Sequence, residues 1–248
     1  MRVVEKSICG NFRETNEDAT GIFHNGTGQI LIMVSDGMGG HQYGDVASSF
    51  VLDRIGEAWK SENLLDVDTG EQFLRNLVMK VNRSLYDYQE ENPRYRGMGT
   101  TLVLAAFIEE TIIILNVGDS RAYVMNPRSI EQVTKDHSFV NMLVDAGEIT
   151  ADEAKRHPKK NIITKAMGTD RLIQADVFRL RNRQYDYLIV ASDGLTDEMA
   201  TDEIHTLTYT SEKALSDKAD DLIVRAEKNG STDNISLVLA DLKASESE

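Results

Sequence analysis

The chain has 248 residues, 41% of them hydrophobic, which is enough to bury the core of one large domain. Acidic residues outnumber basic ones by 41 to 27, and the formal charge of −14 disfavours a nucleic-acid or anionic-membrane surface. The start of the chain lacks the apolar core of a signal peptide, no segment has the length of a membrane span, and Cys9 is the only cysteine. We therefore expect a single cytoplasmic domain over residues 1–248, without an internal disulfide.

The N-terminal part of the chain predicts strands. Short strands are expected at residues 2–6 and 19–24, on either side of the polar segment RETNED at 13–18, which is too polar to belong to the core. Asn25, followed by a glycine, predicts a tight hairpin into an apolar strand that begins at Ile30. The polar segment is therefore expected to be an exposed loop beside the central strands.

The next part predicts two helices and then a strand meander. Apolar residues recur every three and four positions over 47–59 and again over 74–88, a spacing typical of amphipathic helices that cover a sheet. Three segments rich in Ile, Val, Leu and Thr follow at 102–107, 111–117 and 120–126. Their short connections favour antiparallel hairpins over helical crossovers.

The C-terminal part predicts a mixture of helices and strands. The expected elements are, in order, a helix at 139–146, a short helix opened by a capping box at 150–153 and ended near Pro158, strands at 172–180 and 185–191, a helix at 211–228 and a strand at 235–242. Strands outnumber helices, and the helices come in blocks. This order favours an α+β sandwich over a doubly wound sheet.

Four aspartates flank apolar runs with strand character. Asp36 and Asp193 each follow such a run in the sequence Ser-Asp-Gly, Asp119 ends the run IIILNVGD, and Asp233 lies just before the run at 235–240. A single Asp-Gly after a strand is most simply a turn, but four strand-end aspartates predict one shared centre. Carboxylate oxygens without a Cys or His pattern suit Mg²⁺ or Mn²⁺ rather than Zn²⁺.

Seven motifs resemble, in order and spacing, those of the metal-dependent protein phosphatases of the 2C type. They cover nearly the whole chain: RETNED at 13–18, SDGMGGHQYGDVAS at 35–48, GMGTT at 97–101, NVGDSRAY at 116–123, TKDHS at 134–138, ASDGLTD at 191–197 and STDNIS at 231–236. GMGTT alone is weakly specific, whereas DGMGGH, GDSRAY, SDGL and TDN in series are very specific. The chain is similar in character to the short enzymes of Gram-positive bacteria that reverse Ser/Thr kinases.

The resemblance implies an α+β fold, specifically a four-layer αββα sandwich of two antiparallel sheets flanked by helix pairs, with metal ions at one end. It implies a protein-serine/threonine phosphatase that uses two Mn²⁺ or Mg²⁺ ions and has a place for a third. The implied metal positions are Asp36, which bridges two cations, Gly37 through its carbonyl, Asp193 and Asp233 at the second cation, Asp119 with Asp193 at a weaker third cation, and Glu17 and Asp18 through metal-bound water.

The reaction implied by this centre is direct hydrolysis, in which a hydroxide bridging two cations displaces the Ser/Thr alkoxide. Arg13 matches the residue that holds the substrate phosphate, a task suited to the paired donors of a guanidinium. The alternative is a surface Arg that pairs with a neighbouring glutamate. Met38 follows Asp-Gly where the animal members carry histidine, so the proton donor is either His41 or metal-bound water.

The segment at about 138–165 corresponds to the variable flap of the family. Lys159 and Lys160 give it positive charge in an acidic molecule, so these lysines either help to select substrates or only end a helix. The implied partners are phosphorylated proteins and the Ser/Thr kinase that modifies them, and we expect a monomer.

Other enzyme classes fit the sequence less well. Cys9 and Arg13 bracket three residues, whereas a cysteine-dependent phosphatase needs five, and no Walker A loop is present. The segment Asp66-Val67-Asp68 hints at a haloacid-dehalogenase nucleophile, but the apolar run before it is too short for a central strand. Two relatives with the same matched residues remain as alternatives: a phosphatase specific for a phosphorylated sigma-factor regulator, and an inactive protein that only binds phosphoproteins.

Overall fold

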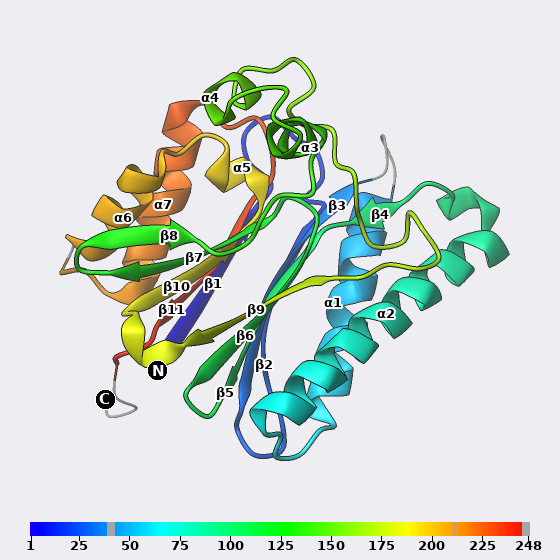
Figure 1. The fold of residues 1–248 in the computed structure, drawn as a ribbon, viewed down its shortest axis with the longest axis horizontal. Helices are drawn as coiled ribbons and strands as arrows, with labels where there is room; N and C mark the ends of the chain where they lie inside the picture. Colours follow the sequence, from blue (N-terminus) through cyan, green and yellow to red (C-terminus); the bar gives the residue numbers. More distant parts are fainter. Residues whose placement is uncertain (39–42, 211, 245–248) are drawn as a thin grey trace.

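The computed structural model describes residues 1–38, 43–210 and 212–244, and within them the strands form two antiparallel sheets (Figure 1). The strands are β1 Arg2–Ile8, β2 Asp18–His24, β3 Ile30–Met38, β4 Gly99–Thr100, β5 Leu102–Ile108, β6 Thr111–Val117, β7 Arg121–Asn126, β8 Ser129–Gln132, β9 Asp176–Arg181, β10 Tyr187–Ala191 and β11 Ile235–Asp241. One sheet has the order β1-β11-β10-β7-β8. The other has the order β2-β3-β5-β6-β9, with β4 paired to β3 outside that path.

Two pairs of helices cover the outer faces of the sheets. The helices are α1 Gly44–Lys60, α2 Val67–Glu91, α3 Phe139–Asp145, α4 Ala151–Ala154, α5 Asp193–Thr196, α6 Thr201–Tyr209 and α7 Leu215–Asn229, with short 3₁₀ turns η1 Pro93–Tyr95 and η2 Asn182–Gln184. The pair α1 and α2 packs on the β2–β9 sheet, and the pair α6 and α7 packs on the β1–β8 sheet. The predicted four-layer αββα sandwich is confirmed.

Strand β3 shows how the sequence builds these layers. Successive side chains of a strand point to opposite faces of a sheet, so Leu31 and Met33 pack against the helices, whereas Ile32 and Val34 pack against the other sheet. Both faces are fully buried, which explains why this strand is an unbroken apolar run. The strand therefore crosses the centre of the molecule and places Asp36 at one end of the sandwich.

The aspartates of the segment 66–68 have structural partners. Asp66 is the N-cap of α2, where its side chain accepts a hydrogen bond from the backbone N–H of Thr69. Asp68 forms an ion pair of 2.8 Å with Arg179 on β9. Both contacts fit the start of a helix, so the hint of a dehalogenase nucleophile has a structural explanation.

The structure corrects several predicted boundaries. The strand predicted from residue 172 begins at Asp176, because its partner strand β6 ends at Val117 and the pairing starts at Asn116 opposite Asp176. The helix predicted over 211–228 begins at Leu215, and the helix α6 before it was not predicted. Short elements β4, β8 and α5 were also missed.

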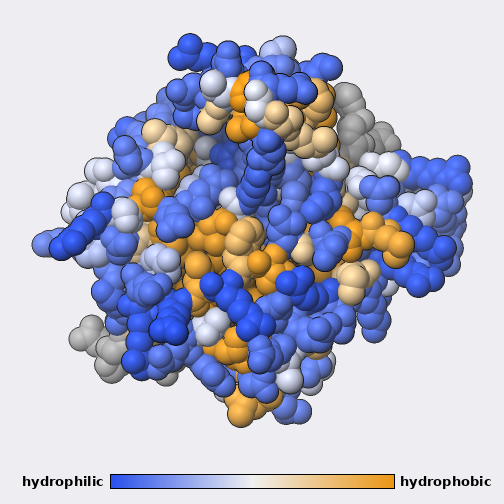
Figure 2. All heavy atoms as spheres, viewed as in Figure 1, coloured by the Kyte–Doolittle hydropathy of each residue, from blue (hydrophilic) through white to orange (hydrophobic). Residues whose placement is uncertain are grey.

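The face seen in Figure 2 is mainly polar, with an apolar band across its middle. The partly buried Phe178 and Leu180, on the edge strand β9, pack against the core between the two sheets. Among the helices in the described ranges, none combines the length and the apolar character that a bilayer crossing requires.

Candidate active site

Five aspartates meet where the two sheets end side by side. Asp18 and Asp36 are register partners on β2 and β3, and Asp119 follows β6 of the same sheet. Asp193 opens α5 directly after β10, and Asp233 lies just before β11, two neighbouring strands of the other sheet. Each sheet thus contributes carboxylates to one acidic centre.

The electrostatic state of these aspartates shows how close they are. Burial raises the pKa of Asp36 well above its usual range, and the charges of the other four aspartates raise it further. The pKa of Asp119 is raised to about 8, mainly by burial and then by the charge of Asp193. Burial likewise raises the pKa of Asp18 to about 7 and that of Asp193 to about 6. Burial and mutual repulsion therefore favour partial protonation of this centre near neutral pH when no cation is bound.

The donor set fits hard divalent cations. Two carboxylate oxygens, Asp119 Oδ1 and Asp193 Oδ1, are buried without a hydrogen-bond partner among the described residues, an arrangement that is costly unless something binds them. The side chains are not yet arranged as a ligand set, since no three His, Cys, Asp or Glu groups in the described ranges already form one. Asp233 instead contacts Arg13, and Asp18 accepts a hydrogen bond from the Ser192 hydroxyl at 2.8 Å.

Thr101 holds Asp36 in place and links it to the loop of Asp119. The Thr101 hydroxyl accepts a hydrogen bond from the Asp36 N–H at 2.9 Å, and the Thr101 N–H donates to the Asp36 carbonyl at 2.8 Å. The same hydroxyl lies 2.6 Å from the hydroxyl of Ser120, and both are fully buried. The sequence analysis assigned no role to Thr101, although it lies in the GMGTT motif.

Asn234 and Ser192 are further residues to which the sequence analysis gave no role. The Asn234 side chain, only 4% exposed, contacts three backbone groups of the loop between β1 and β2. Ser192 lies between the strand ends: its hydroxyl accepts from the Ser236 N–H at 3.1 Å and donates to Asp18. Their positions directly beside Asp233 and Asp193 in the chain are the signal that could have indicated them.

Arg13 lies at the edge of the acidic centre. Its Nη2 is 2.7 Å from Asp233 Oδ2, and its Nε donates to the Thr232 carbonyl. The alternative partners considered from the sequence, the neighbouring glutamates, are therefore not its ion-pair partner here. The Arg13 side chain remains 47% exposed, so it faces both the carboxylates and solvent.

The remaining predicted residues lie around the centre. Gly37 lies where the main chains of β3, α1 and the Glu17 loop meet: a Cβ at this position would be 2.1 Å from the Gly44 carbonyl oxygen. The Glu17 backbone accepts hydrogen bonds from the Gly37 N–H and the Ser48 hydroxyl, and its side chain lies against Gly44. The structure thus places the Glu17 side chain against the start of α1 and its backbone beside Gly37. His41, the candidate proton donor, lies outside the described residues.

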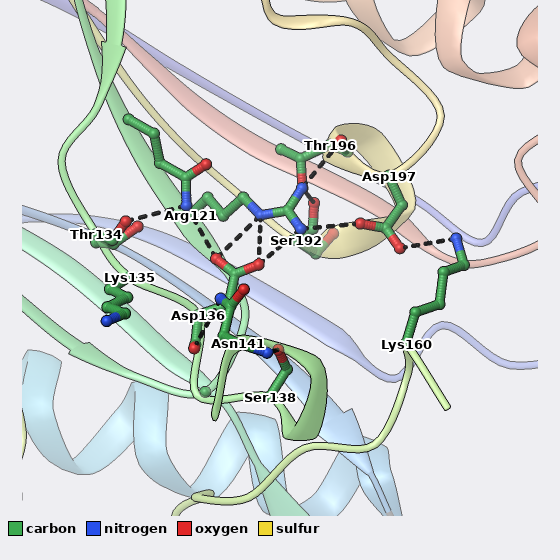
Figure 3. Close-up of polar contacts among 12 residues, drawn as sticks. Arg121, Thr134, Lys135, Asp136, Ser138, Asn141, Lys160, Ser192, Thr196 and Asp197 are labelled. Carbon is green, nitrogen blue, oxygen red and sulfur yellow. Dashed lines mark hydrogen bonds and ion pairs between the residues drawn. The ribbon is translucent and has the colours of Figure 1, made fainter. Parts of the chain in front are cut away.

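Arg121 joins the acidic centre to the segment that carries α3 and α4 (Figure 3). Its guanidinium donates to both carboxylate oxygens of Asp136, to the Thr196 carbonyl at 3.0 Å, and lies 3.1 Å from Asp197. Asp197 in turn pairs with Lys160 at 3.3 Å. These contacts connect α5, which begins with a candidate metal ligand, to the segment at 138–165.

A cavity of about 610 Å³ lies between α3, α4 and the body of the protein. Its lining runs from Asp119 past the Arg121 and Asp136 pair to residues 196–201. Both lysines of interest have local partners, because Lys160 pairs with Asp197 and the Lys159 ammonium lies 5.4 Å from the centre of the Phe139 ring. Because Asp119 is part of its lining, the cavity adjoins the acidic centre.

A two-sheet sandwich with an acidic centre at one end agrees with the class of protein that the sequence motifs resemble. Residues 13–240 match the family model of Protein phosphatase 2C, and the chain belongs to this family. It is 39% identical to the serine/threonine phosphatase stp of Listeria welshimeri over 233 residues, which cover 94% of this chain and 92% of the relative.

Solved structures give the same result. The crystal structure of the serine/threonine phosphatase Stp1 from Staphylococcus aureus is similar with a TM-score of 0.94 and 48% identity, covering 98% of this chain and 95% of that chain. The catalytic domain of the serine/threonine protein phosphatase PstP in complex with two manganese ions has a TM-score of 0.81 and 30% identity, covering 97% of each chain. The predicted family, the α+β fold and the function as a protein-serine/threonine phosphatase are confirmed. The alternatives of an inactive relative or a sigma-factor regulator phosphatase are not favoured.

Proposed function

We propose that this chain hydrolyses phosphoserine and phosphothreonine in proteins at the acidic centre, with divalent cations held by Asp36, Gly37, Asp193 and Asp233. The observation that carries the proposal is the convergence of five aspartates from both sheets, two of them with buried carboxylate oxygens that lack a partner in the described ranges. The two manganese ions of the PstP structure support a divalent metal requirement. We propose two Mn²⁺ or Mg²⁺ ions, with Asp119 holding a third beside Asp193.

When bound, such cations neutralise the charge of the phosphate and activate a water molecule for attack on phosphorus. The protein supplies the arrangement around them. Thr101 fixes the main chain of Asp36, and Ser192 directs Asp18 toward the centre by its hydrogen bond. We assign Asp18, whose carboxylate accepts a hydrogen bond from Ser192, and Glu17, whose side chain lies against Gly44, to contact with the cations through water.

Arg13 is proposed to hold the phosphate of the substrate. The guanidinium lies beside Asp233 and is still half exposed, so it can offer two donors to phosphoryl oxygens at the mouth of the centre. A fixed Arg at this point orients the phosphate for attack. The proton for the leaving alkoxide would come from His41, which lies outside the described residues, or from water at the cation site.

The helical segment at 138–165 is proposed to act as a flap that helps to select phosphoprotein substrates. It is supported by the cavity of about 610 Å³ between this segment and the residues next to Asp119. The opposing Ser/Thr kinase, the monomeric state and the cytoplasmic location stay predictions from the sequence.

The proposal is tested by Asp36→Ala, assayed with Mn²⁺ on p-nitrophenyl phosphate and on a phosphothreonine peptide. We expect this variant to lose turnover of both substrates and to bind fewer Mn²⁺ ions in a calorimetric titration. Asp220→Ala is the matched control, since Asp220 lies on α7 and pairs with Lys6. Near-normal rates in Asp36→Ala would remove the proposed centre.

A further inference from the structure

The carboxylate of Asp119 depends on its main chain for its position. No described residue donates a hydrogen bond to its buried Oδ1. The residue before it, Gly118, has φ of +109°, and a Cβ there would lie 2.7 Å from the side chain of Thr101. The turn from β6 into Asp119 therefore requires glycine, and whatever holds Gly118 also sets the direction of the carboxylate.

His137 holds both backbone groups of Gly118. Its ring Nδ1 accepts a hydrogen bond from the Gly118 N–H at 2.9 Å, and its own backbone N–H donates to the Gly118 carbonyl at 2.9 Å. The imidazole is only 12% exposed. One residue thus fixes the peptide units on either side of Gly118, and Asp119 follows directly.

The contacts of the ring define its tautomer. Because Nδ1 faces an N–H donor, it must be unprotonated, so the proton of a neutral imidazole lies on Nε2. Nε2 is 3.2 Å from Asp176 Oδ2, an acceptor for that proton. The Lys165 ammonium, 3.0 Å from Nε2, donates instead to the Asp176 carboxylate and to the Gln174 carbonyl. Burial and the charge of Lys165 lower the pKa of His137, which agrees with a neutral ring.

His137 is also the residue where the flap begins. Its carbonyl accepts a hydrogen bond from the Thr164 N–H at 2.8 Å, and the next residue, Ser138, forms a β-bridge with Ile163 and caps α3. The same residue therefore joins the two ends of the flap to the turn that carries Asp119.

We propose that His137 is a positioning residue for Asp119: held by Asp176 in its Nε2-protonated form, it fixes Gly118 and thereby directs the Asp119 carboxylate toward a cation. This inference rests on the proposed role of Asp119 as a metal ligand. Residues that orient a metal ligand in this way typically change metal affinity by about 10–100-fold when they are replaced.

Two isosteric variants separate the two nitrogen atoms of the ring. His137→Asn keeps an acceptor at the place of Nδ1, and His137→Gln keeps a donor at the place of Nε2. Each variant loses one ring hydrogen bond, so a purely structural role predicts similar unfolding midpoints and similar metal binding for both. The positioning role predicts that only His137→Gln exposes the Gly118 amide and weakens Mn²⁺ binding. In this variant the Kd for Mn²⁺ should rise by a larger factor than the KM for p-nitrophenyl phosphate.

The measurements are amide hydrogen exchange of Gly118 in the metal-free protein and a calorimetric Mn²⁺ titration, with Asp119→Asn as the reference for loss of one metal position. In His137→Gln we expect Gly118 exchange at least about tenfold faster and about tenfold weaker Mn²⁺ binding at the position lost in Asp119→Asn. His137→Asn should stay within about threefold of the wild type in both measurements. Equal Gly118 exchange in the two variants would overturn the inference, whatever the metal results.

A different pattern identifies failure of the proposed function. If Gly118 exchange behaves as expected but neither Asp119→Asn nor His137→Gln changes Mn²⁺ binding, the assignment of Asp119 as a ligand is wrong, and the inference ends with it. The ring can also be tested without a variant. The ¹⁵N spectrum of His137 in the wild type should show a protonated Nε2 and a bare Nδ1, and a proton on Nδ1 would contradict the proposed geometry.

Discussion

Replacement of Asn234 by alanine should loosen the loop that carries Arg13. The Asn234 side chain donates to the carbonyls of Cys9 and Thr15, at 2.8 and 3.0 Å, and accepts from the Glu17 N–H at 2.8 Å. These three contacts fasten both ends of the segment that contains Arg13. The position of Arg13 can therefore be changed by a substitution at Asn234, without replacing Arg13 itself.

The size of the effect follows from these contacts. A buried hydrogen bond contributes about 1 kcal/mol net to stability. A buried donor or acceptor that loses its partner and is not reached by water costs about 1–3 kcal/mol. The loop residues are partly exposed, so water reaches some of the released groups, and we expect Asn234→Ala to lower the free energy of unfolding by about 2–3 kcal/mol. For a chain of this size that corresponds to about 4–12 °C in the melting temperature.

The assays are denaturant unfolding and steady-state kinetics with p-nitrophenyl phosphate and saturating Mn²⁺. We expect KM to rise more than kcat falls, because Arg13 is proposed to bind the phosphate before as well as during the reaction. Asn11→Ala is the control: Asn11 lies in the same loop, its side-chain contact to Glu227 is exposed, and the substitution should change stability by less than about 0.5 kcal/mol. Equal stability and KM in the two variants would refute the role given to Asn234.

Two further predictions concern the charge of the centre and the flap. In the metal-free protein the pKa values of Asp18 and Asp119 are about 7 and about 8, above the ordinary value of 3.8. The folded state therefore binds more protons than the unfolded state, and its free energy of unfolding falls as the pH rises from 6 to 8. Mn²⁺ should therefore raise the melting temperature more at pH 8 than at pH 6, and an equal shift at both values would contradict the electrostatics. Replacing residues 140–161 by a short Gly-Ser linker is sterically simple, because the Phe139 N–H already donates to the Ile162 carbonyl at 2.8 Å. Turnover of p-nitrophenyl phosphate should remain near that of the wild type while turnover of a phosphoprotein falls, and equal losses would argue against substrate selection by the flap.

The sequence predicted the strands that deliver the aspartates because their apolar runs are buried on both faces. An apolar run such as that before Asp36 must lie in the core, between a helix layer and the other sheet. The polar residue that ends the run therefore lies where the strand leaves the core. The helix α6 was missed for the opposite reason: it is rich in Thr, which favours strands, and only Ile204 and Thr208 are buried. Its packing on α7 and the neighbouring sheet outweighs the local preference.

The residues that orient the aspartates could not be predicted from local patterns. His137, Thr101 and Asn234 act on segments that are 19, 65 and up to 225 positions away in the chain. A strand-end aspartate can be recognised by its neighbours in the sequence. A side chain that hydrogen-bonds to a distant backbone group can be recognised only when the register of both sheets is known.

The way in which the aspartates are held decides how the centre responds to loss of cations. Their backbones are fixed by groups without charge, the Thr101 hydroxyl at Asp36 and the His137 ring at the turn before Asp119. Repulsion between carboxylates is relieved by protonation, so it does not need to move the strands apart. On the proposed function, cations would replace protons between strand ends that the fold already holds together, and removing them should lower stability without unfolding the sandwich. Binding of cations at the proposed positions would then require only side-chain contacts, such as that of Arg13 with Asp233, to change.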